Sequence, residues 1–136
     1  MSVKDLMIGD YVYDSSFVER RICKVVGIHV YPGYDMGNVE VEPLCSPGNS
    51  IKLTDVEIEP IPLTKEMLLA NGWRDDLTLM YEKKNYYYNG LKLYPYSNLW
   101  LATYSGNNQC LFGNVHELQR LMRGLRVYEG ETFKLE

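Results

Sequence analysis

Residues 58–73, IEPIPLTKEMLLANGW, separate two halves of the chain that differ in character, and the remaining segments are placed by their position relative to this stretch. Pro60 and Pro62 favour extended conformations in the residues before them and remove two backbone hydrogen-bond donors. We therefore expect a strand-rich segment to end at these prolines rather than to continue through them.

A short helix is predicted directly after the prolines. Thr64 is a suitable N-cap, Gly72 is suited to ending the helix, and Leu63 and Leu68 have the spacing of a hydrophobic staple. A helix of one or two turns is not stable alone, so it must dock on the rest of the protein. Trp73 is the expected anchor.

Composition describes an ordinary globular chain of 136 residues, of which 46% are hydrophobic and 24% charged. This length favours one domain, or at most two small lobes. No apolar run approaches the roughly 20 residues that span a bilayer, and the N-terminus does not resemble a signal peptide. We expect a cytoplasmic protein without membrane contact, in which Cys23, Cys45 and Cys110 are free thiols.

Charge is unevenly distributed along the chain, whose net charge is −4. Residues 1–60 contain five Lys and Arg against ten Asp and Glu, whereas residues 61–136 contain nine against eight. The acidic first half disfavours non-specific contact with a phosphate backbone.

The first lobe, residues 1–60, is predicted to consist of about five short strands separated by Gly, Pro and Asn turns. In the second strand the alternation of apolar residues changes phase between Val25 and Val26, with Gly27 next, which indicates a bulge. Further on, Val56 and Ile58 are expected to point inward. This pattern favours a partly open, SH3-like small β-barrel and an α+β fold class.

The second lobe, residues 61–136, is predicted to be an antiparallel meander covered by a C-terminal helix. Asn89 and Gly90 between strand-like runs form the strongest short-range hairpin signal. Asn114 with Glu117 resembles a capping box, and apolar residues recur at helical spacing from Val115 onward. The two lobes are also compatible with one continuous domain.

Three segments carry a resemblance to a known family: IGDYVYD at 8–14, IKLTDVEIEPIPLTKEMLLANGW at 51–73 and VHELQRL at 115–121. Together they resemble a family of small proteins encoded on prophage-like and other mobile elements of gut anaerobic bacteria of the Bacteroides type. The resemblance covers most of the chain. It implies a strand-rich start, a short central helix and a closing helix, and it transfers no activity, cofactor or binding residue.

Histidine and cysteine do not form a recognisable site. His29 and His116 lack His or Cys partners at the spacing of zinc sites, so we expect no metal and no cofactor. His29 is expected to face solvent, and His116 to lie at the surface or to cap the closing helix in part. A Cys110 and His116 nucleophile pair remains an alternative, although a cysteine on an apolar strand more often serves packing.

Paired carboxylates are the other pattern that superficially resembles an active site. Glu40 with Glu42, and Glu57 with Glu59, are each predicted to share one face of a strand. Solvated strands produce this pattern routinely, so we assign no catalytic residue. A hydrolase or a transferase is the third and least favoured function.

Tyrosine dominates the aromatic composition, with twelve Tyr against three Phe. Tyrosine combines a large apolar ring with a hydroxyl group that accepts water, which suits a surface that another protein covers. We therefore expect a non-catalytic interaction module that self-associates or binds a protein partner through a tyrosine-rich hairpin. The candidate contact residues are Lys83, Lys84, Tyr86, Tyr87, Tyr88, Tyr94 and Tyr96.

Nucleic-acid binding in an accessory role is the alternative function. Basic side chains beside aromatic rings, and arginines spaced along a helix, are typical of surfaces that follow a phosphate backbone. The candidate residues for this alternative are Lys83, Lys84, Arg120, Arg123 and Arg126.

Overall fold

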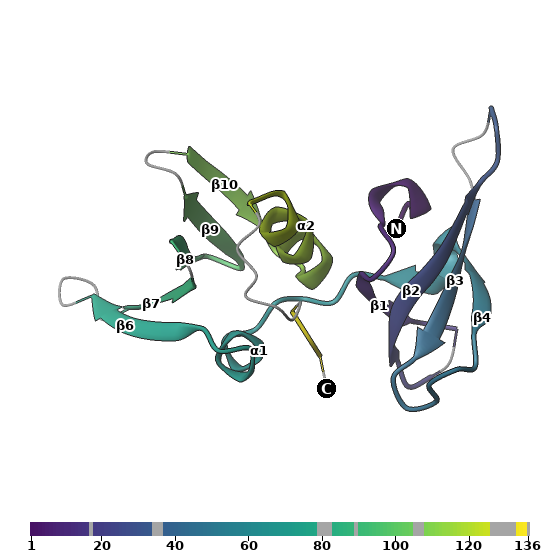
Figure 1. Ribbon diagram of the computed structural model, residues 1–136, viewed down its shortest axis with the longest axis horizontal. Helices are drawn as coiled ribbons and strands as arrows, with labels where there is room; N and C mark the ends of the chain where they lie inside the picture. Colours follow the sequence, from purple (N-terminus) through teal and green to yellow (C-terminus); the bar gives the residue numbers. More distant parts are fainter. Residues whose placement is uncertain are drawn as a thin grey trace. The chain divides into compact units, whose positions relative to one another are not determined.

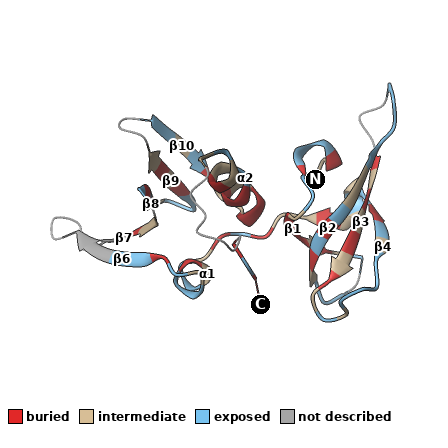
Figure 2. Cartoon of the chain, viewed as in Figure 1, coloured by how far each residue is buried: buried red, intermediate tan, exposed pale blue. Residues whose placement is uncertain are grey.

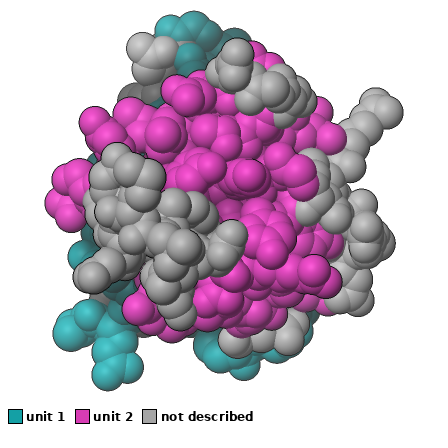
Figure 3. Space-filling view, turned by 90° about the vertical axis from the view of Figure 1, so that its left-hand side faces the viewer, with its two compact units in different colours: residues 1–61, 135–136 teal, residues 62–134 magenta. Residues whose placement is uncertain are grey.

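The computed structural model is α+β and consists mostly of strands (Figure 1). It describes residues 1–16, 18–33, 37–78, 83–88, 90–104, 108–125 and 133–135, with 76–78 and 83–85 described by their backbone. The chain divides into two compact units (Figure 3). The first comprises residues 1–61 with the C-terminal residues 135–136, and the second comprises residues 62–134.

The first unit contains one curled antiparallel sheet in the order β4-β3-β2-β1-β5 (Figure 1). Its described elements are η1 Val3–Asp5, β1 Tyr11–Asp14, β2 Arg21–Val30, β3 Gly37–Pro43, β4 Ile51–Thr54, η2 Asp55–Glu57 and β5 Ile58–Glu59, where η denotes a 3₁₀ helix. Along β3 buried and half-buried residues alternate strictly, so one face of the strand lines the core (Figure 2). The fully buried valines Val12, Val25, Val39 and Val41 belong to this core.

The predicted bulge in the long second strand is confirmed. The register between β2 and β3 shifts between Val25 and Gly27. A Cβ atom on Gly27 would lie 3.2 Å from the Cβ of Glu40, so glycine also fits the close approach of the two strands at this point.

The prediction that Val56 points inward is wrong. Residues 55–57 form the 3₁₀ helix η2 instead of continuing the strand, and Val56 is 86% exposed. The side chain of Glu57 accepts hydrogen bonds from the backbone N–H and the hydroxyl group of Thr54, which stabilises this helical turn. After the turn, Ile58 returns to the core.

The second unit contains an antiparallel sheet in the order β10-β9-β8-β7-β6 with two helices. Its described elements are α1 Lys65–Ala70, β6 Arg74–Thr78, β7 Lys83–Tyr88, β8 Leu91–Tyr96, β9 Leu99–Tyr104, β10 Asn108–Phe112 and α2 Val115–Leu125. Tyr88 pairs with Leu91 in the predicted hairpin, of which Asn89 lies outside the described residues. The predicted meander and closing helix are both present.

The central helix α1 is capped as predicted. The hydroxyl oxygen of Thr64 accepts the N–H of Met67, and Gly72 follows the helix with a positive φ of 81°. The N–H of Trp73 donates to the carbonyl of Leu68, which completes a Schellman ending. Leu68 and Trp73 are both buried, so the helix and the residue that follows it are both anchored in the interior of the unit.

None of the described helices combines the length and the apolar character that crossing a bilayer requires.

Candidate functional site

The sheet of the second unit has one buried face and one open face. Side chains directly opposite each other in an antiparallel sheet lie on the same face, and successive residues alternate between faces. The inner face carries the buried residues Tyr86, Leu91, Leu93, Trp100, Ala102 and Phe112. Among the residues whose side chains are described, the intervening ones of β7 to β10 are half-buried or exposed, and they form the outer face.

Tyr86 lies in the interior of the second unit. Contrary to the prediction, its ring is not available to a partner. It is 3% exposed, and its ring meets that of Trp100 edge to face at a centroid distance of 5.7 Å. Tyr88 shares this side of the sheet, and its ring lies 5.7 Å from that of Trp73. Tyr87 points the opposite way and is half-buried.

Part of the outer face forms an apolar cluster, which we call the tyrosine-leucine face. Its members are Tyr94, Tyr96, Leu99, Leu101 and Leu111. Tyr94 lies opposite Leu101, which lies opposite Leu111, so these three side chains form one row across three strands. Tyr96 and Leu99 form the next row. Tyr96 is 58% exposed, Leu99 43% and Leu111 50%, which is unusual for three neighbouring large apolar residues.

Two exposed cations lie on the same face of the sheet, in the row next to that of Tyr94. Arg74 lies opposite Tyr87, and Tyr87 lies opposite Lys92 on the next strand. Both Arg74 and Lys92 are exposed. The predicted cations Lys83 and Lys84 are in β7, and their side chains lie outside the described residues.

The arginines proposed for nucleic-acid binding do not present a uniform basic surface. Arg120 is exposed on α2, whereas Arg123 is half-buried and has its Nη1 atom buried. Arg126 lies outside the described residues. Of the three predicted arginines, the structure describes two, and one of these two has an exposed guanidinium group.

The predicted surface position of His116 is wrong. His116 is 6% exposed and lies on the buried side of α2 together with Val115 and Gln119. Cys110 is half-buried on β10, and burial, assisted by the charge of Glu117, raises the pKa of its thiol. A raised pKa keeps the thiol protonated at neutral pH, which is the opposite of what a nucleophilic cysteine needs. His29 is exposed, as predicted.

The carboxylates of Glu40 and Glu42 accept hydrogen bonds from residues close to them in the sequence. Glu40 accepts a hydrogen bond from the hydroxyl group of Ser50, and Glu42 accepts one from the N–H of Gly48. The prediction that Glu57 and Glu59 share a strand face is wrong, because Glu57 is in η2 and only Glu59 is in β5.

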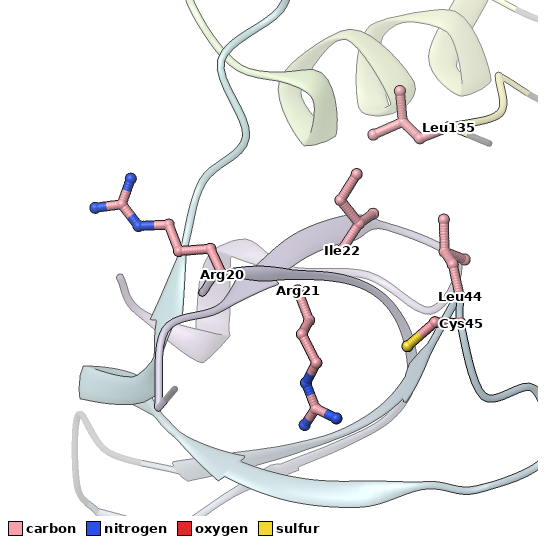
Figure 4. Close-up of a pocket in the computed structure, with 6 residues that line it drawn as sticks. All are labelled: Arg20, Arg21, Ile22, Leu44, Cys45 and Leu135. Carbon is pink, nitrogen blue, oxygen red and sulfur yellow. The ribbon is translucent and has the colours of Figure 1, made fainter. Parts of the chain in front are cut away.

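The first unit also contains an apolar pocket of about 540 Å³, which the sequence analysis missed (Figure 4). Ile22 and Leu44 line it together with Leu135 from the C-terminal end of the chain. Arg20 and Arg21 line it too. Figure 4 shows Arg20 pointing away from the apolar side chains. No local sequence signal identifies this pocket, because its walls come from segments far apart in the chain.

Both arginines of the pocket are paired with carboxylates. Arg20 lies 2.9 Å from Glu59, and Arg21 lies 2.7 Å from Asp14. These ion pairs leave the apolar wall as the main feature of the pocket. Within the described part of the chain, His, Cys, Asp and Glu do not gather in groups of three that could hold a metal ion.

Comparison of the chain with protein-family models, with curated proteins and with solved structures gave no match.

Proposed function

We propose that the protein is a non-catalytic interaction module that binds a protein partner through the tyrosine-leucine face. The observation that carries this proposal is the exposure of Tyr96, Leu99 and Leu111 on one face of a sheet whose opposite face carries the buried residues of this unit. Exposed apolar patches of this kind are typical of surfaces that another molecule covers.

A protein partner fits this surface better than a nucleic acid does. Bases stack on aromatic rings, and Tyr94 and Tyr96 would serve that purpose. The leucines Leu99, Leu101 and Leu111 make up more than half of the cluster, and aliphatic side chains provide no stacking surface. Leucine and tyrosine together with flanking arginine and lysine resemble the apolar centre and polar rim of a protein interface.

The partner surface should combine apolar side chains with carboxylates. Arg74 and Lys92 are exposed beside the cluster, and long-range attraction between these cations and an acidic partner would speed the encounter. Burial of the apolar centre would then slow dissociation.

We also propose that the first unit is a partly open, SH3-like barrel. The support is the single curled antiparallel sheet with five strands among the described residues and a bulge in its longest strand. The resemblance to a mobile-element family is consistent with an accessory protein in which such a small barrel accompanies a binding surface.

The test is recovery of a partner from nuclease-treated extract of the native host by tagged full-length protein. Tyr96→Ser removes the most exposed ring of the face, and we expect it to abolish recovery of a protein that the wild type retains. Tyr31→Ser is the matched control, because Tyr31 is 48% exposed in the first unit. This control should retain the same protein.

Equal recovery by wild type and Tyr96→Ser would reject the tyrosine-leucine face as the binding surface. Binding to single-stranded DNA that weakens steeply with salt, and that Lys92→Gln reduces, would favour the nucleic-acid alternative.

A further inference from the structure

Each sheet has two edge strands, and proteins normally protect such edges from pairing with other chains. Charge, proline and short length are the common protections. In the first unit, the edge strand β4 carries Lys52 and the other edge strand, β5, has two residues. In the second unit, the edge strand β6 begins with Arg74 and Asp75.

The fourth edge, β10, shows none of these protections. Its sequence Asn108–Phe112 reads NQCLF, which contains no charge and no proline over five residues. Its register with β9 runs without a bulge from Asn108 opposite Tyr104 to Phe112 opposite Trp100. Of the four edges, β10 is therefore the one best suited to pair with another strand.

The backbone of Gln109 and Leu111 points away from β9. The carbonyl of Gly113, the next residue after β10, accepts the N–H of Leu63 at 2.9 Å, on the side away from β9. Because backbone groups alternate in direction along a strand, those of Leu111 and Gln109 point to the same side as those of Gly113.

The hairpin between β8 and β9 leads to the same assignment of which backbone groups of β10 point toward β9. Tyr96 and Leu99 close a two-residue turn between β8 and β9, so they exchange backbone hydrogen bonds with each other. The backbone groups of Trp100 and Ala102 then point toward β10, where they meet Phe112 and Cys110. This leaves Gln109 and Leu111 as the residues whose N–H and C=O groups face outward.

We propose that a second copy of this chain pairs with β10 through these outward groups, in an antiparallel arrangement about a two-fold axis. Gln109 of each copy would lie opposite Leu111 of the other, so that each copy offers two donors and two acceptors. Cys110 would lie at the axis, directly opposite Cys110 of the second copy. The two five-stranded sheets would join into one continuous sheet.

A second copy is the occupant that fits this edge best. A two-fold arrangement brings two copies of the same strand together, which places like charges close to each other for a charged strand such as β6 and no charges for β10. Pairing also places the half-exposed Leu111 of each copy beside the second strand and covers part of its apolar surface. The chain as a whole has a net charge of −4, so an uncharged contact is the least repulsive way for two copies to meet.

The first test measures the molecular mass of the full-length protein by sedimentation equilibrium across a wide range of concentration. We expect a reversible monomer-dimer equilibrium. Leu111→Pro removes one outward N–H and preserves the hydrogen bonds to β9, so a folded variant should remain monomeric. Leu111→Ala keeps the N–H and is the matched control, which should still dimerise.

The second test needs no folded proline variant. In a Cys45→Ser background, mild oxidation with diamide should join two copies through Cys110: the two thiols lose two protons and two electrons, and diamide is reduced to its hydrazine. Directly opposed residues of a non-hydrogen-bonded pair have Cα atoms about 4.5 Å apart, within the range of a disulfide. Cys23 is fully buried and should not react. Cys110→Ser in the same background should give no linked dimer.

A monomeric mass at every concentration, or a dimer that persists in folded Leu111→Pro, would overturn the proposal. The proposal does not depend on the proposed function, because it rests on the backbone groups at the edge of β10 and shares only Leu111 with the tyrosine-leucine face. Tyr96→Ser should therefore leave the dimer intact while it abolishes partner recovery.

Discussion

At the residue scale, the buried ion pair of Asp14 and Arg21 is the clearest polar feature of the first unit. Asp14 is fully buried on β1, and its carboxylate accepts hydrogen bonds from the backbone and side chain of Ser16 and from Arg21. Asp14→Asn should lower the free energy of unfolding by about 2 kcal/mol, because these are hydrogen bonds to a charged group. Chemical denaturation measures this change.

The exposed ion pair of Arg20 and Glu59 provides the control. Their side chains are 60% and 39% exposed, so Glu59→Gln should cost less than about 1 kcal/mol. An equal loss of stability in Asp14→Asn and Glu59→Gln would contradict the role assigned to burial.

The same carboxylate predicts how stability depends on pH. Burial alone would raise the pKa of Asp14, but the hydrogen bonds from Ser16 and Arg21 outweigh it and hold the pKa below its ordinary value. A lowered pKa in the folded state stabilises the protein above the unfolded pKa of about 4, and this contribution is lost as pH falls through the folded pKa. The difference in stability between wild type and Asp14→Asn should therefore shrink in acid, as denaturation at a series of pH values would show. A constant difference down to low pH would contradict this account.

The three cysteines should react with alkylating agents at very different rates. Burial raises the pKa of Cys23 to about 11, with a further contribution from Asp14, and the pKa of Cys110 is also raised. Cys45 is exposed. Because the thiolate is the reactive form, iodoacetamide should modify Cys45 first and Cys23 only on unfolding. Peptide mass spectrometry of the labelled protein measures this order, and early modification of Cys23 would contradict its burial.

At the element scale, two glycines in the second unit should respond to alanine in opposite directions. Gly72 has a φ of 81° at the end of α1, so Gly72→Ala should destabilise the protein by about 1 kcal/mol. Gly124 lies inside α2, and a Cβ atom there would meet nothing within 4 Å. Gly124→Ala should therefore stabilise the protein by about 0.5 to 1 kcal/mol. Thermal melts of the two variants measure both shifts, and shifts of the same sign would contradict the roles assigned to these two glycines.

The elements that could be predicted from sequence are those specified by neighbouring residues. Thr64 and Gly72 identify both ends of α1 because caps act within one helical turn. Gly27 identifies the bulge because the apolar alternation changes phase beside it. These signals need no knowledge of the rest of the fold.

Predictions failed where a distant or competing interaction decides the position of a side chain. Val56 is exposed because the hydrogen bonds between Glu57 and Thr54 favour a 3₁₀ turn over a continued strand. Tyr86 is buried because Trp100, from another strand, packs against its ring. A run of three tyrosines indicates which residues alternate, but not which of the two faces is covered.

At the scale of the whole molecule, the chain returns to its first unit at the C-terminus. Leu135 is 5% exposed and lines the pocket with Ile22 and Leu44. Leu135→Ala should lower the stability of the first unit by about 2 kcal/mol through loss of buried apolar contact. Hydrogen exchange should show faster exchange in β2 and β3 and little change in β8. Equal acceleration in both units would instead indicate that they unfold together.

The tyrosine-leucine face could be predicted only in part from sequence and the open edge at β10 not at all, because both depend on which strands neighbour each other. The predicted contact residues Tyr94 and Tyr96 belong to this face, whereas Tyr86 is buried and the leucines Leu99, Leu101 and Leu111 were not predicted. The sequence signal for this surface was the excess of tyrosine over phenylalanine.

Hydroxyl-radical footprinting of the full-length protein, free and in complex with its recovered partner, tests the proposed surface most directly. We predict that the partner protects Tyr94, Tyr96 and Leu99 from oxidation and leaves Tyr31 of the first unit unchanged. Oxidation of Tyr96 at the same rate in the free protein and in the complex would contradict the account.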